Sequence, residues 1–193
     1  MTRVLIVYAS RHGGSAGIAD RIGETLEAAG LEVLVRAASK MPSPESFDGC
    51  VVGAGVYMGS WVKEGTEYLA RFADSLALRP VWLFSSGPLP GSSRTTNAPT
   101  DPIELALGPA TGPGSGGRRR IDELAHKIGP RDHRVFDGAF DPVSPPRVIS
   151  ERFVRMFPGS KKILPAGDFR DWPAIEEWAR TIATALREVA TVG

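Results

Sequence analysis

A short polar segment near the start of the chain, residues 10–15, has the composition of an anion-binding turn. It consists of Ser10, Arg11, His12, Gly13, Gly14 and Ser15. It follows an apolar stretch, residues 3–9, that predicts a buried parallel strand, and it precedes an amphipathic stretch, residues 18–26, that predicts a helix. The first N–H groups of a helix lack internal partners and lie at the positive end of its dipole, so this order of strand, turn and helix favours a phosphate.

The residue types in the turn suit that role. The two glycines permit a close backbone approach to a ligand, the two serines offer hydroxyl donors, and Arg11 or His12 adds positive charge. The alternative is an ordinary strand-to-helix turn, in which Ser15 is only the N-cap and the glycines only permit the bend. The turn by itself does not decide between these two interpretations.

The composition is that of a globular domain with almost balanced charge. The chain has 193 residues, of which 42% are hydrophobic, and a formal net charge of +1. This balance argues against a nucleic-acid partner. Cys50 is the only cysteine, which excludes an internal disulfide, and its apolar surroundings predict an inert core thiol. The three histidines are scattered, without a carboxylate cluster at ligand spacing, so we predict no metal site.

The sequence predicts a soluble cytoplasmic protein. The N-terminal residues lack the pattern of a signal peptide, and no uncharged apolar run approaches the ~20 residues of a membrane helix. Residues 147–157 combine arginines with apolar residues. This segment either lies on a membrane surface or packs on the domain, so we expect peripheral membrane contact at most.

Apolar and amphipathic segments alternate along the rest of the chain. Four more strands are predicted, over residues 31–36, 47–54, 81–85 and 134–140. Further helices are predicted over residues 61–76, 121–128 and 172–189. The pattern predicts an α/β fold with a five-stranded, doubly wound parallel sheet. We expect a single domain, residues 1–193, with a long loop at 86–117 and an insertion at 141–167.

This order of elements resembles the flavodoxin-like superfamily. Within it, the chain resembles the menaquinone-dependent protoporphyrinogen oxidase group in residues 8–13, 52–59, 137–140 and 167–172. The resemblance implies a three-layer fold with the strand order 2-1-3-4-5. It also implies FMN as the cofactor, bound across the carboxyl ends of the strands at the topological switch point.

The resemblance implies a role for each matching position. Residues 10–15 would hold the phosphate of FMN. A second group would run beside the isoalloxazine, with Tyr57 stacking on it: Ala54, Gly55, Val56, Tyr57, Met58 and Gly59. A third group would line the other edge of the ring: Ser85, Ser86 and Gly87. The flavin itself carries the electrons, so we expect no catalytic side chain.

We therefore predict an FMN-dependent oxidoreductase with a small-molecule redox substrate, and the resemblance suggests protoporphyrinogen oxidation with a quinone acceptor, a step of heme biosynthesis. Two alternatives stay open. A flavodoxin-type electron carrier is disfavoured by the nearly neutral charge, since such carriers are strongly acidic around the flavin. A flavodoxin-like module with another ligand, such as a deazaflavin, is left open by Arg11 and His12, where a flavodoxin turn has small or hydroxyl residues.

Overall fold

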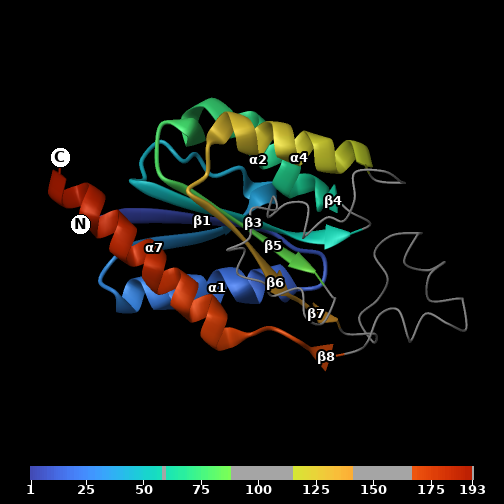
Figure 1. Cartoon of the computed structure of the whole chain (residues 1–193), viewed down its shortest axis with the longest axis horizontal. Coiled ribbons are helices and arrows are strands. Elements are labelled where there is room, and N and C mark those ends of the chain that lie inside the picture. Colours follow the sequence, from blue (N-terminus) through green and yellow to red (C-terminus); the bar gives the residue numbers. More distant parts are fainter. Residues whose placement is uncertain (58–59, 88–114, 141–166, 193) are drawn as a thin grey trace, which may run out of the picture.

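A parallel sheet forms the centre of the computed structural model, which describes residues 1–57, 60–87, 115–140 and 167–192. Its parallel strands are β1 (Arg3–Ala9), β2 (Glu32–Ala37), β3 (Gly49–Tyr57), β5 (Val81–Gly87) and β6 (Asp132–Asp137). They lie in the order β2-β1-β3-β5-β6 (Figure 1). Counted among themselves, these strands have the predicted order 2-1-3-4-5, so the predicted fold class is confirmed.

Helices cover both faces of the sheet. α1 (Gly14–Ala28) and α7 (Trp172–Val192) cover one face, and α2 (Lys63–Ala77) and α4 (Ser115–Ile128) cover the other (Figure 1). In α1 the buried residues Ile18, Ile22 and Leu26 recur every fourth position, as expected for one helical face. Gly30 follows the C-cap residue of α1 with a left-handed φ of 82°, and Leu31 N–H donates to the Leu26 carbonyl at 3.2 Å.

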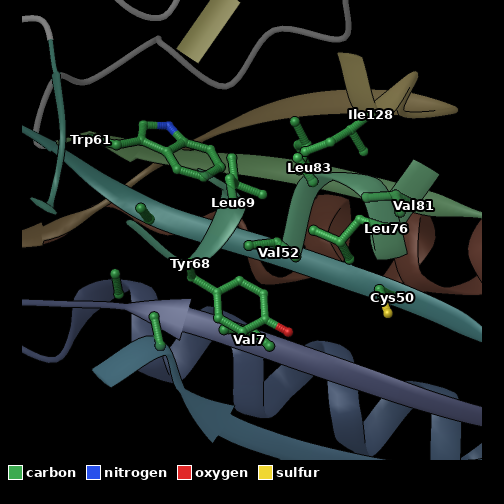
Figure 2. Packing of buried hydrophobic residues seen from close by; sticks show 14 of the residues in the cluster. Val7, Cys50, Val52, Trp61, Tyr68, Leu69, Leu76, Val81, Leu83 and Ile128 are labelled. Atoms are coloured by element: carbon green, nitrogen blue, oxygen red, sulfur yellow. The ribbon is translucent and has the colours of Figure 1, made fainter. Parts of the chain in front are cut away.

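The core has two halves, one on each face of the sheet, because successive side chains of a strand point to opposite faces. In β1, Leu5 and Val7 belong to the half under α2 and α4, whereas Val4 and Ile6 belong to the half under α1 and α7. All these side chains are fully buried. Figure 2 shows the first half, where the labelled residues are Val7, Cys50, Val52, Trp61, Tyr68, Leu69, Leu76, Val81, Leu83 and Ile128.

The segment after β3 differs from the prediction. The helix expected from residue 61 begins at Lys63, and a short strand, β4 (Ser60–Trp61), precedes it. β4 runs antiparallel to the end of β3, with Val56 opposite Trp61. The chain therefore turns back on itself before α2, and this places the Trp61 side chain in the core, where it is 4% exposed.

The predicted strand 134–140 is divided into two. β6 ends at Asp137, and β7 (Ala139–Phe140) pairs with β8 (Gly167–Asp168) in a separate antiparallel ribbon. We call this pair the C-terminal ribbon. Between β2 and β3 lies a short 3₁₀ helix, η1 (Ala38–Lys40).

The predicted loop and insertion fall largely outside the described residues. Ser86 and Gly87 belong to β5, and α4 begins at Ser115, so residues 88–114 of the predicted loop are not described. Of the insertion at 141–167, only Gly167 is described, and the segment 147–157 lies outside. Within the described ranges, the structure contains no helix with the length and hydropathy needed to cross a membrane.

Candidate functional site

The residues predicted to form a site come from separate segments, which meet at one edge of the sheet. The carboxyl ends of β1, β3 and β5 are in register, with Ala9 opposite Ala54 and Ala54 opposite Ser85. The phosphate turn, residues 10–15, follows β1 directly. The flavin-edge segments, residues 54–57 and 85–87, are the last residues of β3 and β5. Met58 and Gly59, which belong to the same prediction, lie outside the described residues.

The phosphate turn leads into α1 without a side-chain cap. Gly13 is the N-cap residue of α1, with φ 85° and ψ −14°, and this cap makes no side-chain hydrogen bond. That turn also carries no acidic residue. The interpretation of Ser15 as N-cap is wrong, because Ser15 lies inside the helix. The backbone N–H groups and the dipole of α1 thus form an end that favours an anion.

Close packing fixes this turn against its neighbours. A Cβ atom built on Gly14 would lie 3.4 Å from the backbone nitrogen and oxygen of Ala139 in the C-terminal ribbon. A Cβ atom built on Gly55 would lie 3.2 Å from Ser15 Oγ and 3.1 Å from the Tyr57 ring. The glycines therefore let the phosphate turn, the first flavin-edge segment and the ribbon approach one another closely.

Tyr57 joins the phosphate turn to the flavin-edge segment. The guanidinium carbon of Arg11 lies 4.8 Å from the centroid of the Tyr57 ring, a cation–π contact. The His12 ring lies 6.2 Å from the same ring, tilted by 56°. Arg11 therefore places positive charge on the aromatic ring that we predict to stack on a flavin.

Ser85 and Ser86 point to opposite faces of the sheet. Ser85 is fully buried, and its Oγ accepts a hydrogen bond from Trp61 Nε1 at 2.8 Å and lies 2.9 Å from His133 Nε2. Its hydroxyl thus belongs to a polar network inside the half of the core under α2 and α4. A cofactor role for the Ser85 side chain stays a prediction, as it does for Ser86, which is 5% exposed.

The C-terminal ribbon contributes residues that the sequence analysis did not assign to the site. A Cβ atom built on Gly138 would lie 2.5 Å from the Gly87 carbonyl oxygen, so Gly138 lets the chain pass closely over the end of β5. After the ribbon, Arg170 donates to the Asp168 carboxylate through Nε and Nη2, at 2.7 and 2.6 Å. These hydrogen bonds from Arg170 hold the pKa of Asp168 below its usual value. In the sequence, the only signal for Gly138, Asp168 and Arg170 was the resemblance in residues 137–140 and 167–172. That resemblance did not assign a role to any of them.

These features fit a phosphate-bearing aromatic cofactor. The uncapped end of α1 suits the phosphate, and the half-buried Tyr57 ring beside it suits a flat ring system. Within the described part of the chain, no group of three or more His, Cys, Asp or Glu side chains is arranged to hold a metal ion.

A comparison with protein families finds one matching model, that of a flavodoxin domain, over residues 5–141. This range covers more than half of the chain and contains every predicted site residue. No curated protein matches the chain.

Solved structures with a similar fold include flavodoxins and one larger enzyme. A mutant flavodoxin from Pseudomonas aeruginosa is 19% identical, with a TM-score of 0.53, and the match covers 96% of this chain and 99% of that one. A flavodoxin from the domain Archaea is 14% identical, with a TM-score of 0.53 and the same coverage. The rubredoxin:oxygen oxidoreductase of the anaerobe Desulfovibrio gigas is 14% identical, with a TM-score of 0.55. In that case the match covers 97% of this chain but 37% of the other. At these identities the likeness establishes the fold alone.

Proposed function

Because the chain belongs to the flavodoxin domain family, we propose that it is an FMN-dependent redox protein with its site at the carboxyl edge of the sheet. FMN is the cofactor that this family membership supports. The arrangement that carries the proposal is the contact between the phosphate turn and the flavin-edge segment, made by Arg11 and Tyr57 at 4.8 Å. It brings an anion-binding helix end and an aromatic ring within the reach of one cofactor.

Each part of the site has a distinct task in this proposal. The N–H groups of the first turn of α1 hold the phosphate, and Gly13 and Gly14 give them access to it. Tyr57 and the ends of β3 and β5 orient the ring system. When bound, FMN supplies the capacity to take up and release electrons. The protein side chains orient the cofactor and set the charge around it.

The charge near the site favours an oxidoreductase with a small-molecule substrate over an electron carrier. Carrier proteins of this fold use acidic surroundings to attract basic partners, whereas here Arg11 lies on Tyr57 in a chain with a net charge of +1. A cation at this place complements a substrate that bears carboxylates. Protoporphyrinogen is such a substrate, and with a quinone as acceptor it is the specific reaction that the resemblance suggests.

The test uses the FMN-loaded chain under anaerobic conditions with protoporphyrinogen and menadione, a soluble quinone. Porphyrin formation is followed by its fluorescence, with free FMN at the same concentration as the control. We expect porphyrin to form faster with the chain than with free FMN, and to require the quinone.

Two results would overturn the specific proposal. In the first, the loaded chain forms no porphyrin but passes electrons quickly to cytochrome c, which indicates a carrier. In the second, the chain binds a deazaflavin in preference to FMN, which indicates a module for another ligand.

A further inference from the structure

A residue far along the chain packs on the first turn of α1. Arg170 follows the C-terminal ribbon, yet its Nη1 lies 3.5 Å from the carbonyl oxygen of Gly14, the first residue of α1. A Cβ atom built on Gly17 would collide with the same Nη1. The glycine at position 17 therefore leaves the space that the guanidinium of Arg170 occupies beside the phosphate turn.

The guanidinium is held in this place from two further sides. Asp168 accepts its bidentate hydrogen bonds from Nε and Nη2, as described above, a geometry that only arginine offers. The Trp172 ring lies beneath it, with 4.3 Å between the guanidinium carbon and the ring centroid. The Arg170 side chain is 16% exposed and forms a 2.6 Å ion pair with Asp168. Its one remaining nitrogen, Nη1, is the atom directed at α1.

A second arginine, Arg21, also lies against the Trp172 ring, and it provides a comparison for Arg170. The guanidinium carbon of Arg21 lies 5.0 Å from the Trp172 centroid, and its Nη1 lies 2.8 Å from Glu176 Oε1. Arg21 thus links α1 to α7, as Arg170 links α1 to the ribbon. Arg21 belongs to the second turn of the helix, and its side chain contacts Trp172, Glu24 and Glu176.

We propose that Arg170 is a positioning residue for the phosphate turn. Its Nη1 approaches the Gly14 carbonyl oxygen and occupies the space beside Gly17, and its positive charge lies near the helix end that meets the phosphate. Asp168 and Trp172 hold it in the required orientation. This inference rests on the proposed binding of FMN, and it concerns the phosphate part of that ligand alone.

The test compares FMN with riboflavin, which has the same ring system but no phosphate. The dissociation constant of each is measured by flavin fluorescence quenching on the deflavinated chain. For Arg170→Ala we expect an increase of about tenfold in the FMN dissociation constant and less than about twofold for riboflavin. Arg21→Ala is the matched control, because it removes a cation from the same tryptophan without touching Gly14 or Gly17, and we expect it to leave both constants within about twofold.

Two further measurements keep the inference testable. If Arg170→Ala does not fold, the Asp168→Asn variant tests the inference instead. It keeps the arginine but weakens the hydrogen bonds that hold its guanidinium, and we expect about threefold weaker FMN binding. If riboflavin binds too weakly to measure, the pH dependence of FMN affinity tests the inference instead. FMN affinity of the unmodified chain should rise as the phosphate loses its second proton near pH 6, and this rise should be smaller in the variant.

The outcomes separate this inference from the proposed function. Equal losses for FMN and riboflavin in Arg170→Ala would overturn it, because they indicate a general structural role, and so would unchanged FMN binding. A loss of the same size in Arg21→Ala would also overturn it. If the unmodified chain binds no FMN, the proposed function itself fails.

Discussion

Replacement of Gly138 by alanine should disturb the point where the C-terminal ribbon crosses the end of β5. The new Cβ atom would lie 2.5 Å from the Gly87 carbonyl oxygen, 3.0 Å from the Gly87 carbonyl carbon and 3.2 Å from Ser86 Oγ. Two of these atoms belong to the backbone, so no side-chain rotation relieves the collision. The chain has to move apart by roughly 1 Å at this crossing, which corresponds to overpacking in a closely packed interior.

The expected loss of stability is the usual cost of inserting a methyl group into a well-packed interior. We expect the free energy of unfolding to fall by about 1–3 kcal/mol, measured by urea denaturation with linear extrapolation. Displacement of Ser86 and Gly87 should also weaken FMN binding several-fold, since both residues belong to the second flavin-edge segment.

The neighbouring glycine supplies the stability control for this variant. A Cβ atom built on Gly87 meets no described atom within 4 Å, so Gly87→Ala should change the free energy of unfolding by less than about 0.5 kcal/mol. If Gly138→Ala is as stable as Gly87→Ala, the close crossing described here is incorrect.

Three other perturbations test the core and the network behind the site. Gly53→Ala places a Cβ atom against the buried Phe84 ring and should lower the free energy of unfolding by about 1–3 kcal/mol, a prediction that an unchanged urea midpoint contradicts. Burial raises the pKa of the Cys50 thiol from 9.0 to about 12. The folded chain then keeps a proton that the unfolded chain loses, so stability should fall as the pH rises above about 9. Cys50→Ala should reduce this slope in pH-dependent urea titrations, and an identical slope would refute the assignment. Trp61→Phe removes the 2.8 Å hydrogen bond to Ser85 and should lower the free energy of unfolding by about 1–2 kcal/mol; an equally stable variant would show that this bond contributes nothing.

The strands and helices could be predicted because the signals that determine them are local, whereas the strand order was predicted from the resemblance to the flavodoxin-like superfamily. The buried strands are continuous apolar runs, and the helices between them repeat their apolar residues with helical spacing, as Ile18, Ile22 and Leu26 do in α1. Parallel strands separated by helices require right-handed crossovers, which restricts the possible topologies. At the start of α1, Gly13 adopts a left-handed conformation with a φ of 85°.

Apolar runs and helical spacing did not predict the short elements or the directions of individual side chains. β4 has two residues, too few for a period of two to be visible, so Trp61 was included in the following helix. Ser85 was assigned to the flavin edge by the resemblance, which says nothing about the direction of its side chain. Since strand side chains alternate, its hydroxyl shares a face with Leu83 and points into the core toward Trp61.

Contacts between distant segments were also not predictable. Arg170 reaches Gly14 across a sequence separation of 156 residues, and neither residue carries a pattern that indicates the other. The space at Gly17 becomes meaningful only when the guanidinium that fills it is known. The cation–π contact of Arg11 with Tyr57 could not be predicted for the same reason, because it joins residues at the ends of two different strands.

The proposed function depends most directly on whether the chain binds FMN. The decisive measurement is a titration of the deflavinated chain with FMN, followed by visible absorption and by quenching of the flavin fluorescence. The arrangement of the phosphate turn and Tyr57 predicts saturable binding of about one FMN per chain, with an absorption spectrum perturbed by the aromatic contact. A chain that stays colourless after exposure to excess FMN and gel filtration would contradict it.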